Sequence, residues 1–338
     1  MSARLSRFKS RVPWRLKLWW KRRRNSELAT PRDLADCYRL ILNRRPDPEG
    51  WATYMSSIRV GAMTRPRLVG CFLESLEYAL NRPLADAEKA PVADLPDFRI
   101  ALRDTVAAIG HEIMHSGHYE PHVARQIQAR LSPGAHFVDA GCNVGYFSLL
   151  AATRVGATGR VSAFDPSRHN VDLLRRSAAL NGMAQIQVYH AALADTPRGF
   201  VFFERDGNGV LLPAAPGLEG RGVPVAGVRL ADALAEAPRV DGIKIDVEGA
   251  EDLVLRGGEA LLRKDQPWML LEFSLQGLRQ VSGIEPGVHL QRLVDWGYTL
   301  WHLPESGEPV AYGQDTAAVL AAASRQSADH LDLLLLPQ

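Results

Sequence analysis

The feature that most constrains the fold is a regular alternation of short apolar runs and helix-like stretches, which begins near residue 97. Each run is four or five residues long, as in a buried strand, and is followed by a stretch with helical spacing, such as residues 146–154. The runs cover residues 136–140, 161–164, 186–189, 243–246 and 268–272. This alternation predicts an α/β domain built on a doubly wound parallel sheet.

Three further segments complete the predicted domain. Residues 298–302 and 330–336 have the pattern of strands that flank a longer loop, and we expect them at the far edge of the sheet. Between residues 200 and 228, the sequence Gly207-Asn208-Gly209 is typical of a hairpin turn. We therefore expect an inserted strand pair in that region.

A small all-α domain is predicted ahead of the sheet, at residues 30–85. Leu34, Cys37, Tyr38 and Ile41 recur at helical spacing, and Thr30-Pro31-Arg32-Asp33 is a typical helix start. After this domain, residues 86–96 are rich in Pro, Ala and Asp and show little periodicity, which is typical of a linker. The sheet-containing domain then covers residues 97–338.

The first 29 residues form a basic, aromatic tail. Residues 1–24 hold ten Lys or Arg and no acid, whereas the whole chain has a net charge of +2, so the remainder carries −8. Because the bulk is acidic, no nucleic-acid partner is expected. Leu16, Trp19 and Trp20 would share one face of a short helix, so residues 4–24 suit an anionic membrane surface. A disordered basic tail is the alternative.

Cysteine content and hydropathy indicate the compartment. Cys37, Cys71 and Cys142 are too few and too scattered for a disulfide framework, which favours a reducing compartment. No stretch approaches the roughly 18 uninterrupted apolar residues of a spanning helix, and no secretory signal follows the basic tail. We therefore expect a cytoplasmic protein, with peripheral binding to the inner face of the membrane as an option.

Residues 111–115 spell H-E-x-x-H, the signature of helical zinc peptidases. In a helix whose apolar stripe contains Ile109 and Ile113, the two histidines fall on the opposite side. Ser116-Gly117 breaks the helix, and His118 stands where the longer zinc signature requires glycine. Solvated histidines are the simpler interpretation, so no zinc site is predicted.

Polar residues follow the first three strands, at the sheet edge where α/β proteins bind ligands. The first strand runs into Asp139 and a turn with Gly141 and Gly145, which matches neither the dinucleotide fingerprint nor a nucleotide phosphate loop. The second strand ends at Asp165, whose carboxylate can accept hydrogen bonds from both ribose hydroxyls. The third leads to Asp195, placed for an adenine amino group. Together these residues predict an adenosine pocket.

Four stretches of the sequence resemble one family, in the same order. FVDAGCNVGYFSLLAA, AFDPSRHNVDLLRRSAALN, IKIDVEGAEDLVLRGG and PWMLLEFS are similar to the motifs of the FkbM family of S-adenosylmethionine-dependent O-methyltransferases. The resemblance covers residues 97–338. It implies a seven-stranded, Rossmann-like class I methyltransferase fold.

The resemblance also implies roles for individual residues. It implies that Asp165 binds the ribose, that Asp195 binds the adenine, and that Glu120 contacts the cofactor or positions the substrate. Cys142 stands where alanine is usual, and Asp165, where glutamate is commoner, reaches less far toward the ribose. His111 and His115 would then lie on the approach to the active site. The residues implied around the methionine part are Asp139, Gly141, Cys142, Asn143 and Gly145.

The end of the fourth strand carries the densest charge in the domain. An alcohol is a poor nucleophile until its proton leaves, so methyl transfer to oxygen needs a base near the acceptor. Asp246 and Glu248 leave the strand on the same side and are the predicted bases, with Glu272 of the fifth strand as a supporting acid. Glu251 is expected to cap the next helix. A divalent cation bound by these carboxylates is an alternative.

The small helical domain resembles an unnamed domain of bacterial surface and glycosylation proteins, through DCYRLILNRRPDPEGWATYMSSIRVG and VGCFLESLEYAL. The predicted function is therefore bacterial methylation of a hydroxyl on a sugar or other surface-glycan or natural-product precursor. Two alternatives stay open. One is an RNA methyltransferase whose tail binds phosphates, and the other is a catalytically silent scaffold at the membrane surface.

Overall fold

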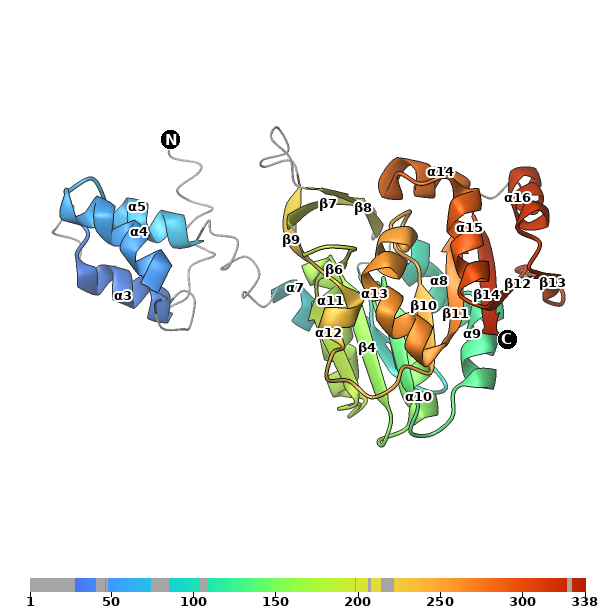
Figure 1. The fold of residues 1–338 in the computed structure, drawn as a ribbon. Coiled ribbons are helices and arrows are strands. Elements are labelled where there is room, and N and C mark those ends of the chain that lie inside the picture. Colours follow the sequence, from blue (N-terminus) through green and yellow to red (C-terminus); the bar gives the residue numbers. More distant parts are fainter. Residues whose placement is uncertain are drawn as a thin grey trace. The chain divides into compact units, whose positions relative to one another are not determined.

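The computed structural model divides into two compact units, Met1–Pro83 and Leu84–Gln338 (Figure 1). The basic tail predicted to bind a membrane, residues 4–24, lies outside the described residues. Within the part of the chain that is described, no helix has both the length and the apolar composition that crossing a membrane requires. The structure describes residues 28–40, 46, 48–73, 85–103, 108–197, 199–205, 208–213, 222–326 and 330–338.

The smaller unit is helical, as predicted. Its described helices are α3 (Pro31–Leu40), α4 (Pro48–Arg59) and α5 (Arg65–Leu73). They enclose a core in which the rings of Tyr38 and Phe72 meet edge to face, with centroids 4.9 Å apart. At the start of α3, the buried Asp33 carboxylate accepts hydrogen bonds from the Thr30 backbone (2.9 Å) and from Arg65 Nε (2.9 Å). This capping residue thereby ties α3 to α5.

The larger unit alternates strands and helices from its first residues onward. In chain order its elements are α7 (Ala85–Lys89), β1 (Val92–Asp94), β2 (Arg99–Ala101), α8 (Ala108–Ser116), α9 (Pro121–Arg130), β3 (His136–Ala140), α10 (Tyr146–Val155), β4 (Arg160–Asp165), α11 (Arg168–Leu180), β5 (Ile186–His190), β6 (Ala192–Leu193), β7 (Gly199–Arg205), β8 (Asn208–Pro213), β9 (Val223–Val228), α12 (Leu230–Ala233), β10 (Gly242–Ile245), α13 (Glu251–Asp265), β11 (Trp268–Phe273), α14 (Leu275–Gly277), the π-helix η1 (Leu278–Ser282), α15 (Pro286–Asp295), β12 (Tyr298–His302), β13 (Val310–Gly313), α16 (Thr316–Arg325) and β14 (Leu331–Pro337).

The stretch predicted as a linker, residues 86–96, is folded. It contains most of α7 and the strand β1, which pairs antiparallel with β2. Arg176 of α11 donates from Nη1 to the carbonyls of Ala87 and Ala90, both at 2.7 Å, and so holds this segment against the larger unit. Elements of three to five residues are too short to produce a detectable hydrophobic period, which explains the difference.

The main sheet has eight strands in the described residues, in the order β13-β12-β14-β11-β10-β3-β4-β5. The five strands from β11 to β5 are parallel to one another and form one side of the sheet, whereas β14 runs antiparallel to both of its neighbours. The sheet is therefore mixed, and it has one strand more than the seven that the resemblance implies. The sequence does not predict the direction of β14, because a run of buried leucines is compatible with a parallel or an antiparallel strand. It does not predict the edge strand β13, because this strand is too exposed to form an apolar run.

Helices cover both faces of this sheet, as predicted for a doubly wound domain (Figure 1). Along β3, Phe137 belongs to the core beneath α9, α10 and α11, and Val138 belongs to the core beneath α12, α13, α15 and α16. All five residues of β3 are buried, and they include the polar side chains of His136 and Asp139.

A second, smaller sheet has the order β6-β9-β7-β8. The expected strand pair is present as β7 and β8, with Arg205 opposite Asn208, and β9 adds a third antiparallel strand. Helix α13 packs closely against the chain between β6 and β7, where a Cβ on Gly257 would stand 2.0 Å from the Ala194 carbonyl oxygen. The small sheet is thereby fixed beside the carboxyl ends of the main strands.

Candidate active site

A cavity opens at the carboxyl ends of β3, β4 and β10. Its wall includes the turn after β3, the end of β4, residues 191–193 after β5, and the loop between β10 and α13. Phe202, Gly209 and Leu211 of the small sheet also line it, as do Ile109 and Tyr119 from the segment before β3. Ligands of open α/β sheets bind at this edge, so the cavity is the candidate site.

The turn after β3 is shaped by close packing. Gly141, Asn143 and Gly145 all have positive φ, at 86°, 49° and 94°. A Cβ on Gly141 would lie 1.7 Å from the Asp246 carbonyl oxygen, and one on Gly145 would lie 2.3 Å from Leu174 Cδ1. Gly141 and Asn143 line the cavity, together with Cys142, whereas Gly145 supports the turn from behind.

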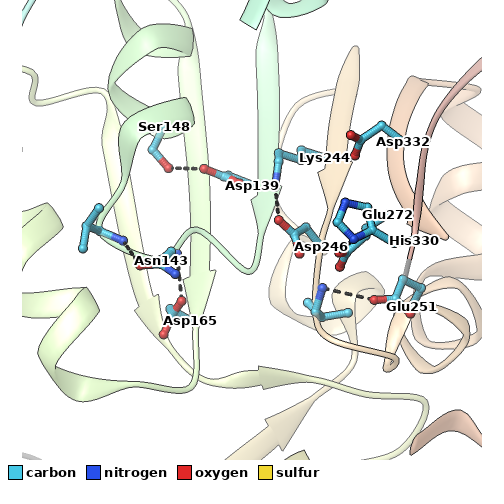
Figure 2. Close-up of polar contacts among 12 residues, drawn as sticks. Asp139, Asn143, Ser148, Asp165, Lys244, Asp246, Glu251, Glu272, His330 and Asp332 are labelled. Atoms are coloured by element: carbon cyan, nitrogen blue, oxygen red, sulfur yellow. Dashed lines mark hydrogen bonds and ion pairs between the residues drawn. The ribbon is translucent and has the colours of Figure 1, made fainter. Parts of the chain in front are cut away.

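Asp139 lies beneath this turn and does not line the cavity. Its side chain is completely buried, and Ser148 Oγ donates a 2.5 Å hydrogen bond to Oδ2 (Figure 2). Oδ1 has no hydrogen-bond partner among the described residues. Burial raises the pKa of Asp139, although Lys244 and Ser148 oppose the shift. Its position fits support of the turn better than direct contact with a ligand.

Asp165, at the end of β4, lines the cavity and joins two loops. Oδ2 accepts the backbone N–H of Asn143 at 2.8 Å, and Oδ1 accepts that of Ser167 at 2.7 Å. Asn170 Nδ2 also donates to Oδ1, at 3.2 Å. Burial raises the pKa of Asp165 to about 7, against the opposing effect of these hydrogen bonds. The carboxyl group thus fixes the rim of the pocket predicted to hold a ribose.

Asp195 does not line the cavity, whereas the preceding residues Ala191, Ala192 and Leu193 do. Its carboxylate Oδ2 is 2.7 Å from Arg256 Nη1 of α13. The carboxylate predicted to contact the adenine is therefore paired with α13, and the part of the cavity wall next to it is apolar.

Lys244 is a lysine inside a buried strand, with 5% of its surface exposed. Its ammonium Nζ donates to Asp246 Oδ2 at 2.5 Å (Figure 2). The same Nζ lies 4.9 Å from the centre of the Phe147 ring. Burial alone would lower the pKa of Lys244, but Asp246, Glu120 and Asp139 together raise it. The lysine therefore remains a cation and compensates the surrounding acids.

Asp246 and Glu272 form a pair of carboxyl groups on neighbouring strands (Figure 2). Burial opposes ionisation of Asp246, yet Lys244 and a hydrogen bond with Glu272 lower its pKa overall. Burial and the Asp246 charge raise the pKa of Glu272. Behind the pair, His330 Nδ1 lies 3.1 Å from Glu272 Oε1. Asp246 lines the cavity, whereas Glu272 borders a separate recess on the other side of Asp246.

The other two acids after β10 differ from each other. Glu248 is exposed, has a φ of 54° and lines the cavity. Glu251 is buried, and its Oε1 accepts the backbone N–H groups of Val247 (3.2 Å) and Gly249 (3.0 Å). Burial raises the pKa of Glu251 to about 7, despite these hydrogen bonds. It closes the loop before α13 and does not cap the helix as expected, because it accepts N–H groups of residues that precede the helix, and the N-cap residue is Ala250.

Tyr119 and Glu120 approach the cavity from the segment before α9. Glu120 has a left-handed backbone (φ 40°) immediately before Pro121, the first residue of α9. Burial raises the pKa of Glu120, and the nearby Lys244 opposes the shift. Tyr119 lines the cavity and shares a hydrogen bond with the Glu120 carboxylate. Glu120 therefore belongs to the charged cluster around Lys244.

Comparison with known families agrees with this site. Residues 134–300 match the model described as the methyltransferase FkbM domain, and residues 34–81 match a domain of unknown function, DUF4214. The chain carries an FkbM methyltransferase domain. Both resemblances drawn from the sequence are thereby confirmed, as is the class I methyltransferase fold of the domain.

Individual relatives are methyltransferases as well. The chain is 29% identical over 193 residues to "Methyltransferase sdnD" of Sordaria araneosa, and the aligned region covers 47% of this chain and 72% of that protein. It is 29% identical over 157 residues to "Methyltransferase 1" of Beauveria bassiana, covering 40% of this chain and 61% of that protein. A crystal structure of methyltransferase FkbM from Methylobacillus flagellatus is 15% identical, covers 88% of this chain and 58% of that chain, and has a TM-score of 0.37.

The FkbM domain is an S-adenosylmethionine-dependent methyltransferase, and its cavity fits that cofactor chemically. Leu193, Phe202 and Leu211 offer an apolar wall for a planar base. Asp165 offers a carboxylate for hydroxyl groups, and Asp246 adds negative charge where a cation would be favoured. These residues, with the turn at 141–143, would hold the cofactor, which when bound supplies an electrophilic methyl group on a sulfonium.

The zinc-like motif is not part of this site. His111 and His115 of α8 are exposed, and their rings stack with centroids 5.1 Å apart. Among the described residues, no group of three or more His, Cys, Asp or Glu side chains is arranged to hold a metal ion. The neighbouring Ile109 of the same helix does reach the cavity.

Several residues of the FkbM site were not singled out from the sequence. Phe202 and Leu211 come from the small sheet, and no local motif marks which wall a strand pair will face. Lys244 could have been identified from the sequence, because a lysine within a buried apolar strand requires a charged partner. His330 precedes the last strand and meets Glu272 only through the pairing of β14 with β11.

Proposed function

We propose that this chain transfers the methyl group of S-adenosylmethionine to a hydroxyl of a sugar or of another surface-glycan or natural-product precursor. The observation that carries the proposal is the Asp246 carboxylate, which lines the cavity and is kept ionised by Lys244 at 2.5 Å. An alcohol must lose its proton as the new O–CH3 bond forms. Asp246 is the carboxylate best placed to accept it.

The remaining residues support that role. Lys244 holds the Asp246 side chain in one orientation, and Glu251 fixes the loop that follows by binding two of its N–H groups. Glu248 lies exposed at the cavity wall, where it can contact hydroxyl groups of the acceptor. Tyr119 and Ile109 also line the cavity, where their side chains would limit access of water.

The acceptor class is inferred from the whole chain. Residues 34–81 match a domain of unknown function, and the acceptor class rests on the resemblance of this segment to a domain of bacterial surface and glycosylation proteins. The acidic bulk argues against RNA as the acceptor. We further propose that the protein works in the cytoplasm, at the inner face of the membrane, where lipid-linked sugar precursors would be presented to it. Residues 4–24 would supply the contact with anionic lipid.

The test uses purified full-length protein and methyl-labelled S-adenosylmethionine. Nucleotide sugars, lipid-linked sugars and an RNA transcript are offered in parallel, and the transferred label is located by mass spectrometry. We expect label on a carbohydrate oxygen, and a loss of about a hundredfold or more in kcat for Asp246→Asn. Label on RNA alone would replace the proposed acceptor. Cofactor binding with no transfer to any acceptor would favour the silent scaffold.

A further inference from the structure

The carboxyl groups of Asp246 and Glu272 lie side by side, because the two residues directly follow the paired Ile245 and Leu271 of β10 and β11 and both border one recess. Each lies close enough to affect the pKa of the other. A carboxylate is only an acceptor, so a hydrogen bond between the two groups requires one proton between them. Asp246 faces the cavity, and Glu272 stands behind it with 18% of its side chain exposed. The pair therefore carries a single negative charge when the cavity holds no cation.

A route to solvent leads away from Glu272. His330 Nδ1 lies 3.1 Å from Glu272 Oε1, and the His330 side chain is 37% exposed (Figure 2). The imidazole can accept a proton on Nδ1 and lose one from Nε2 to water. The order of groups is thus cavity, Asp246, Glu272, His330 and solvent.

Charged side chains from several elements surround the Asp246–Glu272 pair. Lys244 is the cation of the cluster, and the raised pKa of Glu272 reflects burial first and then the charges of Asp246, Glu251 and Glu248. A further positive charge in the cavity would favour loss of the shared proton. The titratable groups nearest the pair are Lys244, Glu248, Glu251, His330, Asp332, Glu120, Tyr119 and Asp139.

We propose that the Asp246–Glu272 pair holds one proton until the sulfonium donor binds, and then releases it to solvent through His330. The inference rests on the proposed S-adenosylmethionine-dependent transfer and adds a role for Glu272 and His330. Glu272 acts as a positioning residue, because it reaches the reacting atoms only through Asp246. The doubly ionised pair is then a stronger base than Asp246 alone.

The balance of the transfer explains why such a pair is useful. The acceptor oxygen forms its bond to the methyl carbon, the S–CH3 bond breaks with its electrons remaining on sulfur, and the acceptor proton passes to the Asp246–Glu272 pair. One positive charge and one negative charge disappear from the site together. The net charge of this partly buried region is therefore the same before and after the reaction, which avoids a large desolvation penalty.

Proton release can be measured without any acceptor, by calorimetric titration in buffers of different ionisation enthalpy at pH 7. S-adenosylmethionine and S-adenosylhomocysteine share every charged group except the sulfonium, so their difference isolates its effect. We expect the full-length chain to release close to one more proton with the sulfonium ligand. By linkage, its affinity relative to the thioether would rise with pH by up to about tenfold per pH unit.

Variants assign the proton to the pair. Glu272→Gln is expected to abolish the difference while binding S-adenosylhomocysteine within about threefold of wild type, which also reports that it is folded. Asp246→Asn should abolish it as well. Glu259→Gln, an exposed glutamate of α13, is the matched control and should keep the difference. Glu120→Gln tests another acid that lies near Lys244.

Equal proton counts for the two ligands in wild-type protein would overturn the inference, whatever the variants do. So would an undiminished difference in Glu272→Gln, a difference that depends on Glu120 alone, or failure to bind either ligand. If the proton difference is found but no hydroxyl compound is methylated, the inference stands and the proposed acceptor is wrong. The two failures are thereby distinguishable.

Discussion

At the scale of single residues, the main feature of the site is a group of buried charged side chains. Lys244 is surrounded by Asp246, Glu120 and Asp139, and it supplies the main compensating charge for these acids. Removing one partner of such a group generally costs about 3–5 kcal/mol, because the remaining charge is left uncompensated. Asp139, with one carboxylate oxygen lacking a partner among the described residues, shows that the compensation is incomplete. The site thus keeps charged groups buried although burial is energetically unfavourable for them.

Glu251 gives a prediction about stability. Its pKa is raised by burial to about 7 from 4.5, so between these values the folded protein binds a proton that the unfolded chain has lost. The stabilising contribution is complete below about pH 4.5 and is lost as the pH rises to about 7. Relative to Glu251→Gln, wild type should lose about 3 kcal/mol of unfolding free energy over this range.

The measurement is urea unfolding of both proteins between pH 4.5 and 8. Glutamine can still accept the N–H groups of Val247 and Gly249, so the loop contact is retained. Glu259→Gln, an exposed change in the same helix, serves as the control and should track wild type. Parallel stability curves for wild type and Glu251→Gln would contradict the prediction.

At the scale of elements, the small sheet forms part of the cavity wall. Strand β8 places Leu211 toward the cavity with 7% exposure, and the adjacent Val210 points the other way with 43% exposure. This alternation is the period of a strand with one covered face. The inserted strands therefore contribute to ligand binding as well as to packing.

Leu211→Ala should weaken binding of S-adenosylhomocysteine about tenfold. The change removes apolar surface from the cavity wall, and a loss of roughly 1.4 kcal/mol is reasonable for part of a leucine side chain. Val210→Ala, one residue earlier in the same strand, should leave Kd within about twofold. Calorimetry on the two variants decides the matter. Equal effects would mean that the strand acts through general stability instead of through the wall.

For the whole molecule, the sequence was informative where a pattern is local and repeated. The five parallel strands could be predicted because each is a separate buried run, and Asp165 and Asp246 because they follow those runs directly. The direction of β14 and the existence of β13 could not be predicted, since both depend on pairing between segments that are far apart in the sequence. The same limit applies to His330, which reaches Glu272 only after that return.

The basic tail provides the prediction at this scale. Residues 4–24, which lie outside the described residues, carry ten Lys or Arg and four aromatic side chains, whereas the remaining chain is acidic. Basic residues near an anionic bilayer contribute about 1 kcal/mol each, and salt screens this attraction. We expect the full-length chain to sediment with phosphatidylserine-containing vesicles and to be released as salt rises from about 0.1 M to about 0.5 M.

Deletion of residues 1–27 should abolish that sedimentation and leave the affinity for S-adenosylhomocysteine unchanged, because the cavity lies wholly within the larger unit. Vesicles of phosphatidylcholine alone are the control for lipid charge, and a structured RNA offered at the same ionic strength tests the rival partner. Changing Trp19 and Trp20 to alanine separates the two attractions, since aromatic insertion matters for a bilayer and little for phosphate pairing. Binding that follows RNA, or that ignores lipid charge, would contradict a membrane role for the tail.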